Sequence, residues 1–460
     1  MRNLEKAINL EKAHRFTGAL ATLLLALFFL TFPALAPARA EMAIQEVTSE
    51  GGITAWLVED YTVPIVTVHF AFSGGTVQDP AGKEGLSNLM AGLFDEGAGD
   101  LDADAFQERL DDVGAEMGFD ARRDAVYGSM RMLAESREAA FDLLRLAVTE
   151  PRFDAEPVER IRAQIATGIQ RDMRDPNVQG RDAFARALYG DHPYARRAEG
   201  TAETLAALTA DDLHALHDRT FARSNLNIAV VGAIDAETLK AELDRVFGGL
   251  PAEPTLEPVG KAQLHLDQRV NQVYALPQAS LQLVYPGIER EDPAFFAAFL
   301  MNHVLGGGTF SSRLFDEVRE KRGLAYGVGS GLVTGDHADM LVIGTSTRAD
   351  RAQETLQLIR DVVRGVAENG VTEAELDKAK TYLIGAYPIN NLDSSTAVAR
   401  TLLELQKDKR GIDYIDRRAA LIEAVTLDEV KAAAARLLTT EPAVLVIGPE
   451  QEDAAEGSGG

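Results

Sequence analysis

The chain has 460 residues, which is enough for two or more domains with substantial hydrophobic cores. Its content of 46% hydrophobic and 25% charged residues excludes a disordered or fibrous protein. The formal net charge of −25 makes nucleic acid and anionic lipid surfaces unfavourable partners and a basic peptide or a less acidic protein easier to accommodate, although the same acidity can simply maintain solubility.

The first forty residues form a segment of their own. A basic start leads into an apolar run, Ala19–Phe32, which is short for a bilayer span, and then into Ala38 and Ala40, small residues at a cleavage spacing. This pattern predicts a signal peptide over residues 1–40, with an uncleaved membrane anchor as the alternative. The chain has no cysteine and so no disulfide. We therefore expect a periplasmic or otherwise exported protein of a bacterial envelope.

Hydrophobic periodicity predicts the elements of the first half. Strands are expected at Ile53–Val58, Ile65–Phe72, Glu116–Asp120, Ala125–Met132 and Asn225–Val231. Helices are expected at Gly85–Leu93, Asp102–Val113, Arg137–Val148, Glu156–Met173, Asp212–Phe221 and Ala236–Phe247. Two prolines in Leu250–Leu256 then indicate the start of a linker.

The second half runs through a similar order. Strands are expected at Leu281–Tyr285, Ala325–Leu332, Met340–Thr345 and Ala443–Ile447, and helices at Phe295–Leu305, Ser312–Lys321, Ala352–Val366, Glu373–Gly385 and Leu427–Leu438. NLNIAVVGAID at Asn225–Asp235 and PAVLVIGPE at Pro442–Glu450 close the two halves alike, which indicates an internal duplication. We expect an α+β protein with two homologous α/β-sandwich domains, 41–250 and 272–448, a linker at 251–271 and a disordered tail at 449–460.

The stretch Leu305–Ser330 holds the clearest candidate site. It opens on three glycines: Gly306, Gly307 and Gly308. They favour either close packing between helices or a flexible hinge that lines a cavity. An amphipathic helix follows and should end at Gly323. Arg319 in its last turn and Tyr326 at the next strand can then reach one carbonyl group; the alternative is a solvated arginine and a core tyrosine.

Several motifs resemble the short, two-domain members of the pitrilysin/insulinase family of zinc metallopeptidases. The resemblance extends over nearly all of the chain after residue 40. It rests on SGGTVQDPAGKEGLSNLM at Ser73–Met90, HPY at His192–Tyr194, the NLNIAVVG strand and LGGGTFSSRLFDEVREKRGLAY at Leu305–Tyr326. Its implication for the fold is one half of a clamshell built from two duplicated domains.

The family's zinc motif, H-x-x-E-H, is degenerate in this sequence. Its two histidines bind zinc, its glutamate is the general base, and a distal glutamate completes the zinc shell. The matching positions hold Asn88, Ala91, Gly92 and Gly168. Asn88 could contact a metal only weakly, and alanine and glycine offer no side-chain ligand, so the resemblance implies no catalytic residue and no metal site in this chain.

The chain could still be a hydrolase on its own if it bound a metal at a different site from that of the family. His214 and His217 are the only closely spaced histidines after residue 40, and their spacing on a helix can bind a metal. No glutamate is placed to help them, so an ordinary amphipathic helix is the favoured interpretation.

In family members with two different subunits, one subunit carries zinc and the other an Arg/Tyr pair, which Arg319 and Tyr326 match. The resemblance implies that Arg319 binds a substrate carbonyl and that Tyr326 donates its phenol proton to the oxyanion. We therefore expect a non-catalytic, substrate-binding subunit of a heterodimeric periplasmic zinc peptidase, inactive alone, with zinc in a homologous partner. The alternative is an inactive structural or peptide-binding scaffold.

Overall fold

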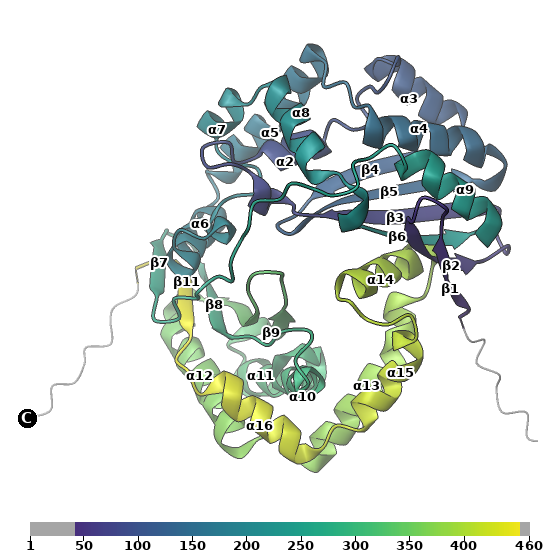
Figure 1. Cartoon of the computed structure of the whole chain (residues 1–460). Coiled ribbons are helices and arrows are strands. Elements are labelled where there is room, and N and C mark those ends of the chain that lie inside the picture. The colour runs from purple at the N-terminus through teal and green to yellow at the C-terminus, as the bar shows by residue number, and fades with distance from the viewer. Residues whose placement is uncertain (1–41, 451–460) are drawn as a thin grey trace, which may run out of the picture. The chain divides into compact units, whose positions relative to one another are not determined.

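The computed structural model describes residues 42–450 (Figure 1). The expected signal peptide, 1–40, and most of the expected tail lie outside the described residues. Residues 44–450 belong to one compact unit. Within the described part of the chain, no helix is both long and apolar enough to cross a membrane. The α+β class expected from the sequence is confirmed, with two sheets and their covering helices.

The first half builds a six-stranded sheet in the order β1-β2-β6-β3-β5-β4. Its strands are β1 (Ile44–Thr48), β2 (Thr54–Glu59), β3 (Ile65–Ser73), β4 (Glu116–Ala121), β5 (Ala125–Leu133) and β6 (Leu226–Gly232). β2 pairs with β6 in parallel, and the other neighbours are antiparallel. The sequence patterns missed β1, because this edge strand buries only Val47 and carries little apolar alternation.

The helices of the first half are α2 (Leu86–Ala91), α3 (Ala103–Asp112), α4 (Arg137–Thr149), α5 (Ala155–Asp172), α6 (Pro176–Tyr189), α7 (Ala202–Ala207), α8 (Ala210–Thr220) and α9 (Ala236–Phe247). α2 is shorter than expected because Gly85 is its N-cap, with φ at +97°, and Gly92 its C-cap. The core around these helices contains Phe70, Phe72 and Phe94, each at most 1% exposed. α6 and α7 were not expected from the sequence.

The second half forms a five-stranded sheet in the order β7-β11-β8-β10-β9. Its strands are β7 (Arg269–Val273), β8 (Gln278–Pro286), β9 (Ala325–Val333), β10 (Met340–Arg348) and β11 (Ala443–Gly448). β7 and β11 are parallel. β7 begins inside the range expected as a linker, because its residues alternate between exposed and half-buried positions and give a weak strand signal.

The helices of the second half are α10 (Phe295–Asn302), α11 (Arg313–Phe315), α12 (Ala352–Asn369), α13 (Glu373–Asn391), α14 (Ser395–Lys407), α15 (Tyr414–Glu423) and α16 (Leu427–Leu438). α10 and α11 are shorter than the helices expected there, because each continues as a π-helical turn, at His303–Gly307 and Asp316–Glu320. α14 and α15 were not expected from the sequence.

Each half supplies one helix to the sheet of the other half. α14 packs against β6 and β3, and the side chain of Gln406 donates a hydrogen bond of 2.8 Å to the carbonyl of Ile228 (Figure 1). α6 packs against β7 and β11, where Phe184 and Leu188 join a buried cluster with Ile447. The predicted domain boundaries, 41–250 and 272–448, stay a prediction. α6 lies in the first of these ranges and α14 in the second, but each covers the sheet formed by the other range.

The contact between β3 and α14 predicts a pH effect at His69. Burial, followed by the charge of Arg400, lowers the pKa of His69 from 6.5 to about 4. Between these values the unfolded chain binds more protons than the folded chain, so His69 contributes stability above pH 6.5 that is lost as the pH falls toward 4. We expect the urea midpoint of the wild-type chain to fall through this window more steeply than that of His69→Gln. Equal slopes would contradict the prediction.

Candidate functional site

Arg319 and Tyr326 lie together at the corner between the π-helical turn Asp316–Glu320 and β9. The guanidinium carbon of Arg319 is 4.9 Å from the ring centroid of Tyr326 and 4.7 Å from that of Phe315. Both distances are within the range of cation–π contacts. Tyr326 is 88% exposed and is therefore not a core aromatic.

The corner is built by a glycine C-cap. Gly323 has φ at +59°, and its amide donates a hydrogen bond of 2.9 Å to the carbonyl of Arg319. The amide of Leu324 donates to the carbonyl of Val318, also at 2.9 Å. These bonds satisfy carbonyls at the end of the turn and redirect the chain into β9. The hydroxyl of Thr347 on β10 then donates to the carbonyl of Leu324 at 2.6 Å. The expected glycine stop is thus confirmed.

The three glycines pack closely against their surroundings. A Cβ atom on Gly306 would lie 2.5 Å from Ser330 Oγ on β9. On Gly307 it would lie 2.9 Å from Asn302 Nδ2, and on Gly308 2.9 Å from a backbone carbonyl. Side chains would therefore separate this π-helical turn from β9 and α10. These contacts favour the interpretation that the three glycines allow close packing, here against a strand as well as a helix. The alternative role of the glycines as a flexible hinge stays a prediction.

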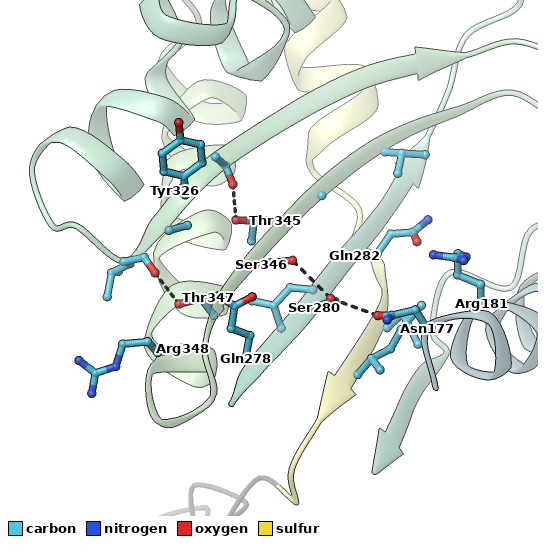
Figure 2. A pocket seen from close by; sticks show the side chains of 18 of the residues that line it. Asn177, Arg181, Gln278, Ser280, Gln282, Tyr326, Thr345, Ser346, Thr347 and Arg348 are labelled. Atoms are coloured by element: carbon cyan, nitrogen blue, oxygen red, sulfur yellow. Dashed lines mark hydrogen bonds between the residues drawn. The ribbon is translucent and has the colours of Figure 1, made fainter. Parts of the chain in front are cut away.

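Tyr326 lines a cavity of about 700 Å³ on one face of the second sheet (Figure 2). Gln278, Ser280 and Gln282 of β8 reach this cavity, whereas Ala279 between them belongs to the hydrophobic core, as expected from the two-residue period of a strand; Leu281 belongs to the core and also borders the cavity. α6 supplies Asn177 to the same cavity. The cavity therefore lies between the corner at Tyr326, which was expected from the sequence, and α6, which was not.

Small polar groups line much of this cavity. The hydroxyl of Ser280 lies 3.3 Å from that of Ser346 and donates to Asn177 Oδ1 at 3.4 Å (Figure 2). The hydroxyl of Thr345 donates to the carbonyl of Gly327 at 2.7 Å. Such a surface can exchange these weak internal bonds for hydrogen bonds to a polar ligand.

One signal could have located α6 from the sequence. Asp175 followed by Pro176 is a helix N-cap with proline at the first helical position. The Asp175 carboxylate accepts a hydrogen bond of 2.8 Å from the amide of Asn177. The packing of α6 on a sheet from the other half had no local signal.

The HPY motif has a structural role at a contact between segments. The Tyr194 hydroxyl donates to the Asp124 carboxylate at 2.6 Å and accepts from the amide of His337 at 3.2 Å. Burial, with the neighbouring Asp124, raises the pKa of Tyr194. Tyr194 thus connects the turn before β5 to the turn between β9 and β10.

The degenerate zinc positions lie on two helices in contact. Asn88 and Ala91 are on α2, Gly92 is its C-cap, and Gly168 is on α5. A Cβ atom on Gly92 would lie 3.1 Å from the side chain of Ile161 on α5. Among the described residues, no three His, Asp or Glu side chains are grouped as metal ligands.

His214 and His217 both pack against aromatic rings. His217 is buried, and its Nε2 lies 2.9 Å from the carbonyl of Val148. The ring of His214 is 4.9 Å from that of Phe153, edge to face. These contacts favour the interpretation of an ordinary amphipathic helix.

Comparison with known proteins identifies the family. Residues 207–383 match the family model described as "Peptidase M16 inactive domain". An "uncharacterized zinc protease" of Streptomyces coelicolor is 30% identical over 84% of this chain and 85% of its own length. A Helicobacter pylori protein described as a "non-peptidase homolog" is 25% identical over 75% of this chain and 79% of its own length.

A solved structure supports the same assignment. The crystal structure of a peptidase M16 inactive domain from Pseudomonas fluorescens matches with a TM-score of 0.83 and 30% identity, and covers 89% of this chain and 98% of that one. The chain therefore belongs to the peptidase M16 family, the pitrilysin/insulinase metallopeptidases, and its residues 207–383 match the domain of that family described as inactive.

Proposed function

We propose that this chain is the non-catalytic, substrate-binding subunit of a heterodimeric zinc metallopeptidase that cleaves peptides. The observation that carries the proposal is the contact between Arg319 and Tyr326, of which Tyr326 lines one end of a cavity that also contains many polar groups. An 88% exposed tyrosine contributes little to folding, whereas an exposed phenol beside a guanidinium suits a substrate carbonyl. The degenerate zinc positions Asn88, Ala91, Gly92 and Gly168 support the non-catalytic part of the proposal.

The two side chains have different roles in this proposal. Arg319 donates hydrogen bonds from its guanidinium to a carbonyl of the bound peptide and so orients the peptide. Tyr326 donates its phenol proton to the oxyanion that develops on the carbonyl under attack. The metal and the general base belong to the homologous partner subunit, and this chain contributes binding and transition-state stabilisation.

The proposal is tested with three preparations: the chain alone, its zinc-bearing homologous partner alone, and the two together. We expect strong cleavage of an unfolded peptide only by the complex, and stoichiometric zinc only in the partner. Metal-dependent cleavage by this chain alone would contradict the proposal. Full activity of the partner without this chain would contradict it as well.

A scaffold without peptidase partnership is the second candidate. The observation that favours it is the description of the Helicobacter pylori relative as a "non-peptidase homolog". A complex that keeps full activity with both Arg319→Ala and Tyr326→Phe would favour the scaffold, because a scaffold does not need either side chain at the reacting carbonyl.

We further propose that the protein works in the periplasm of a bacterial envelope. The proposal rests on the basic, apolar and small-residue pattern of residues 1–40. The mature N-terminus is expected to be Glu41, which mass spectrometry of protein from an envelope fraction can establish. Native protein that retains Met1 in the cytoplasmic fraction would contradict this proposal.

A further inference from the structure

The cavity beside Tyr326 has a charge opposite to that of the chain. The sequence contains 71 acidic residues and 46 Lys and Arg residues. Nevertheless, among residues 42–450 the only charged residues that line this cavity are Arg181 and Arg348, and no carboxylate of this part of the chain lines it. At physiological ionic strength, charges farther away than about 8 Å are largely screened, so these arginines and their immediate partners decide which ligands the cavity favours.

The two arginines differ in how far their charge is already compensated. Arg348 forms an ion pair with Asp350, in which Nε lies 3.0 Å from Oδ1. Arg181 is exposed and forms no ion pair or hydrogen bond through its side chain with any residue in 42–450. The charge of Arg181 also contributes to the lowered pKa of Asp175, after the hydrogen bonds from Asn177, which are the main cause. Arg181 is therefore the guanidinium that remains available to a ligand.

Arg181 and Tyr326 reach the cavity from its opposite ends, on the same face of the sheet. Figure 2 shows Arg181 on α6 at one end of the cavity and Tyr326 on β9 at the other. α6 packs on β11, and β9 is separated from β11 by β10 and β8. Three strand spacings correspond to about 14 Å, which an extended peptide crosses with roughly four residues.

We propose that Arg181 binds a carboxylate of the peptide substrate, roughly four residues from the carbonyl at Arg319 and Tyr326. This inference rests on the proposed peptide-binding function. The carboxylate is either an acidic side chain or the C-terminal group of the peptide, since both present the two oxygens that a guanidinium binds in a bidentate way. The substrate class is thus peptides with a negative charge, although the whole chain is strongly acidic.

The test measures binding of short fluorescein-labelled peptides to the isolated full chain by fluorescence anisotropy. One peptide ends in a free carboxylate, a second is its amide, and a third is the amide with one internal Glu, matched by a Gln version. We expect a carboxylate-bearing peptide to bind about tenfold more tightly than its neutral counterpart, and added salt to reduce this preference. A preference for the free C-terminus over the amide identifies the C-terminal carboxylate as the ligand, and a preference for Glu over Gln identifies an acidic side chain.

Variants of α6 separate this inference from a general effect of charge. Arg181→Gln is expected to abolish the preference, and Arg181→Lys to retain part of it. Arg186→Gln is the matched control, because Arg186 is exposed on the same helix but does not line the cavity. We expect it to keep the full preference, and thermal unfolding of each variant to match that of the wild type.

Three results would overturn the inference: equal binding of charged and neutral peptides, a preference that survives Arg181→Gln, or no measurable binding of any of the four peptides. None of them alters the roles proposed for Arg319 and Tyr326, which are measured by cleavage in the complex. Loss of those roles with the carboxylate preference intact would instead contradict the proposed function.

Discussion

Replacing Tyr326 by phenylalanine is expected to lower kcat/KM of the assembled complex about 10²–10³-fold, the usual effect of losing one oxyanion donor. The substitution removes only the phenol oxygen, and Tyr326 is 88% exposed, so the fold should not change. The measurement is steady-state cleavage of an unfolded peptide by the purified complex, together with the unfolding midpoint. Tyr382→Phe is the control, because Tyr382 is exposed at 57% but does not line the cavity.

Arg319 is expected to show a different pattern. Arg319→Lys keeps the charge but loses the planar guanidinium that lies over the rings of Phe315 and Tyr326, so we expect partial loss of activity. Arg319→Ala should cost more, because it also removes the contact that positions Tyr326. Arg322→Ala is the matched control, since Arg322 follows in the same turn and its guanidinium is bonded to Glu317. Equal losses at Arg319 and Arg322 would point to a structural effect.

Replacing Asp79 by alanine is expected to lower the free energy of unfolding by about 3 kcal/mol, because buried donors lose a charged acceptor. Asp79 is 4% exposed, and its carboxylate accepts hydrogen bonds from the amides of Gly85 and Ser87 at 2.9 Å and from the Ser87 hydroxyl. These bonds hold the start of α2, the helix of the degenerate zinc positions. Urea denaturation measures the loss, and Ser87→Ala, which removes one bond, should cost about 1 kcal/mol.

The pH dependence of Asp79 has the opposite sign to that of His69. Burial raises the pKa of Asp79 from 3.8 to about 6, against the hydrogen bonds from Ser87 and Gly85 that lower it. The folded chain therefore binds more protons than the unfolded chain between these values, and the contribution of Asp79 to stability falls as the pH rises from 3.8 toward 6. Asp79→Asn should remove this slope. A variant with the wild-type slope would contradict the assignment.

The elements that were predicted best are those with complete local signals. α9 and α16 have the expected bounds, because each combines an amphipathic face with a side-chain N-cap, Asp235 for α9 and Thr426 for α16. α14 also has a side-chain cap, at Ser394, but it was missed. Several of its apolar residues face the sheet of the other half, so its role becomes clear only from its packing.

The residues of the candidate site also differ in whether a local sequence signal placed them. Arg319 and Tyr326 are seven residues apart, so the glycine stop between them places both at one corner of the chain. The spacing alone left a solvated arginine and a core tyrosine as the favoured alternative, and the resemblance to the family favoured the pair. Arg181 lies in the first half of the chain, on a helix that packs against the second sheet. No sequence pattern indicates that a helix crosses from one half to the other, so the charge of the cavity could not be inferred from the net charge.

The sequence by itself determined the α+β class, the family, the degenerate zinc motif and the placement of Arg319 and Tyr326 at one corner, because each depends on local periodicity or on motifs with a set spacing. The tertiary structure alone decided that α6 and α14 are exchanged between the sheets, that the glycine run packs against β9, and that Arg181 shares a cavity with Tyr326. The physical reason is that the hydrophobic effect is not directional, so the apolar face of a helix can pack on any complementary apolar surface. Which surface it meets depends on the fold of the whole chain and not on the sequence of the helix itself.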